Sequence, residues 1–293
     1  MATTDFDTLC DGPLAPVLSG LEASRQAAVK RFWLMTAGFA ALAVVAMIFV
    51  PGMSLKLFLV MAILIVGWIV ASRPLDQAGR ALKEPALAAI SGARGLTYDI
   101  GGFAADGYEA IHPLFGRPNS RTFRDRFEGE ENGRRFVFYE ASLVSGSGKS
   151  RRTVFNGLIH TLARHPVQGE TVVVPDRGLF NVFSPGRGME RVRFEDDPEF
   201  ERGLEVYSTR PDEARALVNP VVRQQLKAWR TAHGRVFVRL AGDQVTVALA
   251  EPGDRFESGS MMKATPGRER VRAIWNDLEA VMSQMRQVAG TLG

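Results

Sequence analysis

Two uncharged apolar runs dominate the hydrophobic pattern of the chain, Trp33–Val50 and Leu57–Ser72, and the short segment PGMSLK joins them. A hydrocarbon core of about 30 Å requires roughly 17 to 25 apolar residues per helix. The first run meets this length, and the second needs its flanking residues. Because backbone groups in lipid must be satisfied within their own segment, both runs predict helices, with a break at Pro51-Gly52. The pattern predicts a transmembrane helical hairpin over residues 32–72, and a buried hairpin of a globular domain is the alternative.

Charged residues around the two runs predict how the hairpin is oriented. The connection between the runs carries only Lys56, whereas both outer flanks are basic: Arg25, Lys30 and Arg31 come before the first run, and Arg73, Arg80 and Lys83 follow the second. Positive charge concentrates on the cytoplasmic side of membrane proteins. The sequence therefore predicts a two-span membrane protein, with both chain ends in the cytoplasm and the lipid bilayer as a partner.

The residues on either side of the hairpin predict helices outside the membrane. In the cytosolic tail, residues 1–31, we expect disorder as far as Pro13 and then an amphipathic helix that runs into the first span. Residues 73–95 keep a helical period and predict a stalk, which Pro74 opens and Pro85 kinks or divides. The rest of the chain, residues 96–293, is predicted to form a cytosolic α+β domain.

From Leu96 the pattern changes to the composition and period of β-strands. Strands are predicted over 96–100, 122–128, 134–144, 152–162, 170–174, 191–195 and 203–208. Because no helix-length pattern alternates with these segments, the sheet should be mainly antiparallel. Arg235–Leu240 and Gln244–Ala250 are predicted to form a further hairpin, since their apolar residues alternate on both sides of Ala241-Gly242-Asp243.

Helical patterns accompany the last strands. Short helices are predicted after Pro211 and from Pro220 to about Ala232, and a long one from about Arg268 to Val288. The last helix carries two apolar series of seven-residue period: Val271, Leu278 and Met285, and Ile274, Val281 and Val288. This seam predicts either packing against the protein's own sheet or self-association into a homo-oligomer. The fold class that follows is α+β: an N-terminal two-helix transmembrane hairpin, then a mainly antiparallel sheet domain with packed helices and a long C-terminal helix.

Composition narrows the functional classes. The net charge is +4 and the isoelectric point is near 9.4, but arginines and acids alternate along the chain, which argues against a nucleic-acid partner. Attraction of the juxtamembrane cations to anionic lipid accounts for part of the positive charge. The chain has a single cysteine, Cys10, which excludes an internal disulfide and a multi-cysteine metal site. Because Cys10 lies in a polar tail, we expect it to be a reduced thiol with no function.

Short motifs for cofactors and metals fail on their context. Ser145–Ser150 ends in Gly-Lys-Ser like a phosphate-binding loop, but its first glycine is replaced by Leu143 and a strand pattern follows it where a helix is required. It predicts a hairpin loop without a nucleotide. His160 and His165 lie on opposite faces of a predicted strand and are interpreted as ordinary surface or strand-end residues. No cofactor, metal site or catalytic set is predicted.

The stretch with the most individual character begins at Arg191 and continues to Pro220. Glu195, Asp196 and Asp197 are consecutive acids, and Glu199, Glu201 and Glu205 follow. Such a cluster could bind a cation or serve in acid–base chemistry. The favoured interpretation is a solvated turn whose acids pair with the neighbouring arginines Arg191, Arg193, Arg202 and Arg215.

This same stretch resembles the signature of the DUF3137 family of bacterial membrane proteins. The matching positions are Glu195, Asp196, Phe200, Glu201, Val206, Tyr207, Ser208, Glu213, Ala214, Arg215, Pro220 and Leu226, and the segment Val154–Gly157 also fits the family layout. The resemblance implies an inner-membrane protein with a cytosolic α+β domain. It supplies no catalytic residues, and Tyr207 and Glu213 could serve only to hold a strand to the helix that follows it.

Three functions compete on this basis. The leading hypothesis is a non-enzymatic, membrane-tethered domain that binds a partner protein or small ligand, because a large domain follows a minimal anchor without ionisable residues in its spans. The second is an enzyme acting on an anionic substrate at the membrane face, and the third is a self-associating structural protein. The candidate functional surface comprises Arg193, Glu195, Asp196, Tyr207, Glu213 and Arg215.

Overall fold

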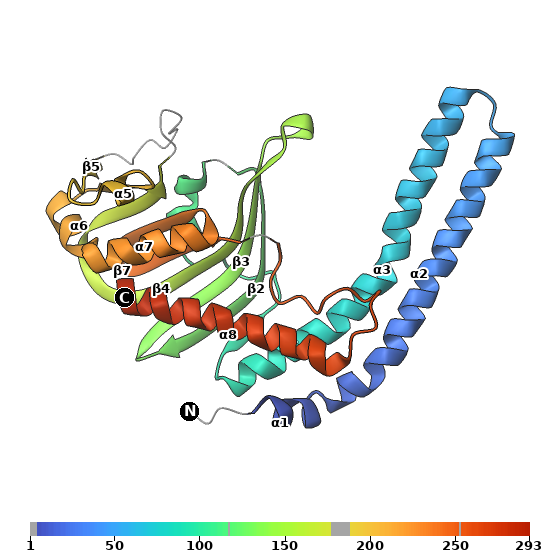
Figure 1. Ribbon diagram of the computed structural model, residues 1–293, viewed down its shortest axis with the longest axis horizontal. Helices are drawn as coiled ribbons and strands as arrows, with labels where there is room; N and C mark the ends of the chain where they lie inside the picture. The colour runs from blue at the N-terminus through green and yellow to red at the C-terminus, as the bar shows by residue number, and fades with distance from the viewer. Residues whose placement is uncertain (1–4, 117, 177–187, 252) are drawn as a thin grey trace. The chain divides into compact units, whose positions relative to one another are not determined.

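The computed structural model describes residues 5–116, 118–176, 188–251 and 253–293 and has an α+β architecture (Figure 1). Two compact units make up the chain: residues 1–94 with 256–278, and residues 95–255 with 279–293. The predicted fold class is confirmed, with two long apolar helices, a mainly antiparallel sheet with helices, and a C-terminal helix. The four-part domain division at residues 31, 72 and 95 stays a prediction.

The first unit is helical. It contains α1 (Phe6–Asp11), α2 (Ala15–Phe49), α3 (Met53–Ala93) and the first half of α8 (Gly267–Leu292). At 1.5 Å per residue, α2 and α3 extend about 52 and 62 Å, well beyond a hydrocarbon core of about 30 Å. Both are long and apolar enough to cross a membrane. Each helix therefore has room for one span and for a further segment outside the membrane.

The two long helices form an antiparallel hairpin (Figure 1). Gly52 has a φ of +80° in the turn, a conformation that favours glycine. A Cβ atom at Gly67 would lie only 2.6 Å from the Phe39 ring, so the absence of a side chain there lets this ring pack against the backbone of α3. Of the large apolar side chains that are exposed in the described residues, nearly all lie between positions 33 and 69.

Three expectations about this unit are wrong in part. The N-terminal segment is ordered from Phe6, because α1 buries Phe6, Leu9 and Cys10. Cys10 is accordingly a buried thiol and does not lie in a polar tail. Pro74 lies inside α3 and does not open a helix, and Pro85 does not divide it, since α3 continues to Ala93. Figure 1 shows that α3 bends along its length, which fits two prolines that remove amide donors from the helix.

Residues far apart in the sequence hold the first unit together. The Arg272 guanidinium lies 3.4 Å from the centre of the Phe6 ring, and Phe6 contacts Trp275 edge to face. The buried Arg270 donates hydrogen bonds to four backbone carbonyls, those of Ser258, Ser260, Lys263 and Thr265, at 2.7–3.2 Å. One side chain thus satisfies the backbone of the irregular segment before α8.

Among the described residues, the sheet of the second unit has seven strands, all paired antiparallel, in the order β1-β2-β3-β4-β6-β5, with β7 pairing with β4. Its strands are β1 (Thr97–Asp99), β2 (Ser120–Glu131), β3 (Arg134–Ser145), β4 (Arg152–Pro175), β5 (Glu190–Val192), β6 (Leu204–Ser208) and β7 (Val236–Ala250). Strands β2 and β3 form a hairpin: Asn132 and Gly133 have consecutive positive φ angles of 53° and 75°, as a two-residue hairpin turn requires.

Strand β4 is the central strand of the sheet and pairs with β3, β6 and β7. It covers both segments that were predicted as separate strands, and register shifts between Ala163 and Thr171 bend it. Its first half pairs with β3 and its second half with β6, while β7 accompanies both halves.

The predicted hairpin at Ala241-Gly242-Asp243 is wrong. Residues 236–250 form one strand, and Gly242, with a φ of +56°, pairs with Val167 at the irregularity of β4. The irregularity shifts the side-chain alternation by one residue, so that the apolar positions before and after it stay on the same face. In the sequence, this one-residue shift in the alternation of apolar and polar residues within a single strand therefore resembled a turn between two strands.

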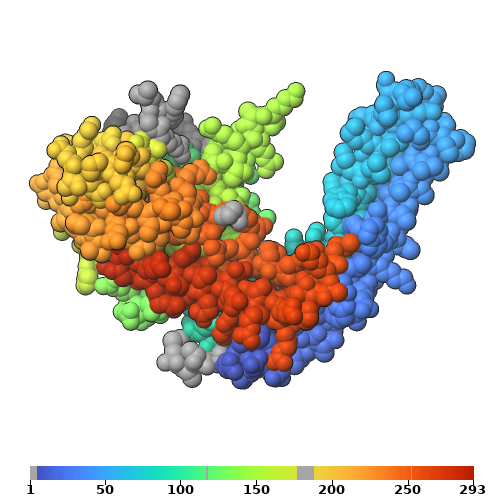
Figure 2. Space-filling model, viewed as in Figure 1, coloured from blue at the N-terminus to red at the C-terminus, as the bar shows by residue number. Residues whose placement is uncertain are grey.

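Helices cover both faces of the sheet. One face buries an aromatic cluster under the short helices α4 (Tyr108–Ile111) and η1 (His112–Phe115). Near the sheet lie α5 (Pro198–Glu201), α6 (Pro211–Leu217), α7 (Pro220–His233) and the second half of α8, and the Trp229 indole of α7 donates to Gln287 of α8 at 3.3 Å. The β3–β4 connection, which contains η2 (Gly148–Ser150), projects from the sheet (Figure 2). The sequence analysis predicted a hairpin loop for this connection, because Ser145–Ser150 lacks the context of a phosphate-binding loop.

The apolar side chains of both heptad series of α8 are buried by other parts of the same chain. Val271, Ile274, Leu278, Val281, Met285 and Val288 are all buried, none of them more than 1% exposed. The apolar seam therefore packs inside the protein, but Val271, Ile274 and Leu278 belong to the helical unit, whereas packing against the sheet was the predicted alternative. It offers no exposed face for a second copy.

Candidate functional site at the acidic turn

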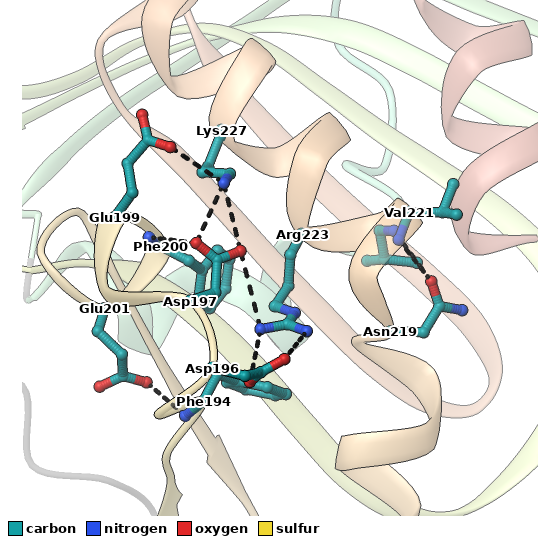
Figure 3. Close-up of polar contacts among 11 residues, drawn as sticks. Phe194, Asp196, Asp197, Glu199, Phe200, Glu201, Asn219, Val221, Arg223 and Lys227 are labelled. Carbon is teal, nitrogen blue, oxygen red and sulfur yellow. Dashed lines mark hydrogen bonds and ion pairs between the residues drawn. The ribbon is translucent and has the colours of Figure 1, made fainter.

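The acidic turn between β5 and α5 is clasped by α7 (Figure 3). Arg223 of α7 donates to both carboxylate oxygens of Asp196, from Nη1 to Oδ1 at 3.0 Å and from Nη2 to Oδ2 at 2.7 Å. The Arg223 side chain is 5% exposed, and its guanidinium lies 4.9 Å from the centre of the Phe194 ring. The hydrogen bonds from Arg223 hold the pKa of Asp196 below its usual range. This bidentate pair fixes the turn to the helix.

A second cation one turn further along α7 extends the clasp. The Lys227 ammonium lies 3.1 Å from Asp197 Oδ1 and 3.1 Å from Glu199 Oε2. Burial alone would raise the pKa of Asp197, but the Lys227 hydrogen bond and the Phe200 amide lower it. The Phe200 amide donates to Asp197 Oδ1 at 3.1 Å, so this carboxylate also caps α5. Asp196, Asp197 and Glu199 are paired with cations, as the favoured interpretation predicted, but their partners Arg223 and Lys227 were not among the expected arginines.

The next acids hold β5 and β6 together. The Phe194 amide donates to Glu201 Oε1 at 2.9 Å. Arg191 bridges Glu201 and Glu205, with ion-pair distances of 3.3 Å and 2.9 Å. The Tyr207 hydroxyl donates to Glu205 Oε2 at 3.1 Å, and burial followed by this carboxylate raises the pKa of Tyr207. Tyr207 is therefore part of a network that spans the two strands.

The remaining candidate residues lie apart from this network. Glu213 of α6 accepts hydrogen bonds from the Gln168 and Gly169 amides at 2.8 and 2.7 Å, which satisfies the backbone where β4 is irregular. Arg215 is exposed and pairs with Asp212 of the same helix at 2.9 Å. Within the described part of the chain, no side-chain hydrogen bond or ion pair joins two of the six candidate residues Arg193, Glu195, Asp196, Tyr207, Glu213 and Arg215.

Arg193 and Glu195 differ from the other candidates, because both are exposed and neither has an ion-pair partner among the described residues. They flank Phe194, which is buried against Phe200 with a ring-centre distance of 5.5 Å. The alternation of the chain thus turns Phe194 inward and presents one positive and one negative side chain outward.

Comparison with known proteins places this region in a family. A family model described as "Protein of unknown function (DUF3137)" matches residues 153–288, from β4 into α8. Over these residues the chain belongs to the DUF3137 family. No curated protein matches the sequence. The chain is also similar to the crystal structure of the mycobacterial trehalose monomycolate transport factor A, TtfA, with 14% identity over 68% of this chain and 95% of that chain and a TM-score of 0.34.

Within the DUF3137 region, a buried polar group was missed by the sequence analysis. Glu251, directly after β7, is 2.9 Å from His233 Nδ1 and 2.9 Å from Arg255 Nη2 and accepts a hydrogen bond from Gln284 of α8. Burial opposes its ionisation, but His233 and Arg255 lower the pKa of Glu251 to about 2. One carboxylate therefore ties together α7, β7, the loop after β7 and α8.

His160 in the same region is not the surface or strand-end residue that was expected. It lies in the middle of β4 opposite Phe138 and Val247 and is 0% exposed. Neither ring nitrogen has a hydrogen-bond partner in the described ranges. Burial lowers its pKa to about 3, so the ring stays neutral. The only signal in the sequence was its place inside an apolar strand.

Proposed function

We propose that the protein is a membrane-anchored binding module: the α2–α3 hairpin holds the α+β domain at the cytosolic face of a bacterial inner membrane, where the domain binds a partner protein. The observation that carries this proposal is the hairpin itself. Its exposed surface between positions 33 and 69 is lined by large apolar side chains, which are costly in water and favourable in lipid. The module acts by position and contact, without chemical catalysis.

The orientation follows from the charges at the two ends of the hairpin. Lys30, Arg31, Arg73 and Arg80 are exposed at the open end, and the turn carries only Lys56. The positive-inside rule assigns the open end to the cytoplasm. The sheet domain, which follows α3, is then cytosolic.

The acidic turn supports binding in preference to catalysis. Asp196 and Asp197 are held by cations of α7, so neither is available as a general base or as a ligand for a cation. Arg193 and Glu195 are the two charges of this turn that remain outward, two residues apart and of opposite sign. We assign them as the contact surface for a protein partner with complementary charges.

Photo-crosslinking in the native membrane tests this proposal. A photoreactive side chain is placed at position 195 of the full-length protein, and the control carries it at Lys149, on the projecting β3–β4 connection. We expect a discrete protein adduct from position 195 that is absent from position 149. Replacing residues 32–72 with a soluble linker should abolish it. An unchanged adduct without the hairpin would refute the role of tethering, and equal adducts from both positions would refute the contact surface.

A further inference from the structure

Four cations at the open end of the hairpin are free of carboxylates. Lys30, Arg31, Arg73 and Arg80 are exposed, and none forms an ion pair with a described acid, including Asp76 between the last two. Other cations of the same unit are neutralised: Arg25 pairs with Glu22 at 2.7 Å, and Lys83 pairs with Glu257 at 3.0 Å. The positive charges of these four side chains are therefore available to bind an anion outside the protein.

Packing between the two helices brings three of these cations to one level. Phe32 meets Trp68 with a ring-centre distance of 5.6 Å, and Phe39 lies against Gly67. Because α2 and α3 are antiparallel, continuing both pairings toward the open end brings Arg31 level with the turn of α3 that contains Arg73. Lys30 is adjacent to Arg31. Arg80 lies about 10 Å further along α3, so it belongs to a different level.

Two tryptophans lie on the span side of this level. Trp33 lies two residues after Arg31 and is 58% exposed. Trp68 lies five residues before Arg73 and is 65% exposed. Phe32 contacts both indoles edge to face, which fixes them at the same end of the hairpin. Tryptophan concentrates where the apolar tails of a bilayer meet its headgroups. The cations next to these rings are thus placed at the depth of lipid phosphates.

We propose that Lys30, Arg31 and Arg73 bind the headgroup of an anionic phospholipid of the cytosolic leaflet. This inference rests on the proposed membrane hairpin and names a lipid partner for it. Each guanidinium can donate two parallel hydrogen bonds to phosphate oxygens, and the lysine adds a point charge. Attraction of about 1 kcal/mol for each cation near an anionic surface corresponds to about fivefold in lipid association. The site therefore selects anionic over zwitterionic lipid.

Native mass spectrometry of the full-length protein tests the site. The delipidated protein is equilibrated with mixed micelles that contain equal amounts of phosphatidylglycerol and phosphatidylcholine, and the ratio of the two bound lipids is measured. We expect enrichment of phosphatidylglycerol on the natural protein, reduced at least fivefold in the triple variant Lys30→Gln, Arg31→Gln, Arg73→Gln. The matched control is Lys149→Gln, Arg151→Gln, Arg152→Gln, which removes one lysine and two arginines from the β3–β4 connection and the start of β4 and should keep the enrichment.

The outcomes separate the lipid site from the anchor. An unchanged ratio in the first triple variant, or an equal loss in the control, would overturn the lipid site. Displacement of bound lipid by millimolar inorganic phosphate would also overturn it, because the cations would then bind a soluble anion. Extraction of the natural protein from membranes by alkaline carbonate would instead refute the proposed anchor. Retention in the membrane combined with a ratio near one refutes only the selection of anionic lipid.

Discussion

Replacement of the buried His160 by leucine is expected to stabilise the protein. The imidazole is completely buried in β4, and its two nitrogens have no hydrogen-bond partners among the described residues. Its neighbours across the strands are the apolar Phe138 and Val247. A leucine has a similar size, suits this environment and carries no polar atom. His160→Leu therefore removes a polar group from the core without opening a large cavity.

The magnitude follows from the cost of burying an unsatisfied polar group, about 1–3 kcal/mol. Some of this gain is offset because leucine does not reproduce the flat imidazole ring. At neutral pH we expect the free energy of unfolding of His160→Leu to exceed that of the natural protein by about 1–2 kcal/mol. Most core substitutions destabilise, so the sign of the effect already tests the reasoning.

The pH dependence provides a second, independent signature. The pKa of His160 is about 3 in the folded protein, below the ordinary value of 6.5 that holds in the unfolded chain. The unfolded chain therefore binds the proton more strongly. The contribution of the neutral His160 ring to the free energy of unfolding is fully present above pH 6.5 and is lost as the pH falls from there toward 3. By about pH 5 the loss amounts to roughly 2 kcal/mol, and the variant does not undergo it.

Urea unfolding of the full-length protein in mild detergent, followed by tryptophan fluorescence, measures both effects. Transitions of the natural protein and of His160→Leu are compared near pH 7.5 and near pH 5. His165→Leu is the matched control, because His165 is exposed on the same strand and its loss should not alter the pH dependence. A less stable His160→Leu, with the same difference at both pH values, would refute the reasoning. The imidazole would then make favourable polar interactions.

Three further substitutions test the packing of the fold. Glu251→Gln removes the negative charge between His233 and Arg255 and should cost about 1–2 kcal/mol in urea unfolding at neutral pH. Because the pKa of Glu251 is held near 2, the natural protein should also lose stability between pH 4.5 and 2, and the variant should lack this loss. Gly242→Val should cost about 1–3 kcal/mol and speed hydrogen exchange in β7, because its φ is +56°, while Gly242→Asn is better tolerated. Leu278→Glu should unfold the protein in circular dichroism, and a folded monomer derived from an oligomeric natural protein would contradict the burial of α8.

Local patterns predicted the elements whose signals lie within a few residues. The apolar runs predicted α2 and α3, and the Asn132-Gly133 turn joins two strands with clear alternation. Pro211 and Pro220 open α6 and α7 as expected, since a first helical position has no use for the missing amide. Such features depend on the backbone and on the nearest side chains.

The errors share a different cause, namely contacts between distant parts of the chain. The helix α1 is ordered by Arg272 and Trp275, more than 260 positions away from Phe6. The phase change at Gly242 is compensated by the irregularity of β4, which the sequence of β7 alone does not reveal. Asp196 and Asp197 were correctly expected to pair with cations. Nevertheless, its partners Arg223 and Lys227 come from a helix that was interpreted only for its apolar positions.

The candidate surface separates into structural and outward-facing residues for the same reason. Asp196 holds α7, Tyr207 donates to the buried Glu205 that also pairs with Arg191 of β5, and Glu213 caps the irregular backbone of β4. A change in any of these three residues would disturb the junction of β4, β6 and α7. Contacts of this kind report the fold and do not report the chemistry of a ligand. Arg193 and Glu195 lie in the same stretch, are exposed and take no part in this packing, and we propose them as the residues that contact a partner.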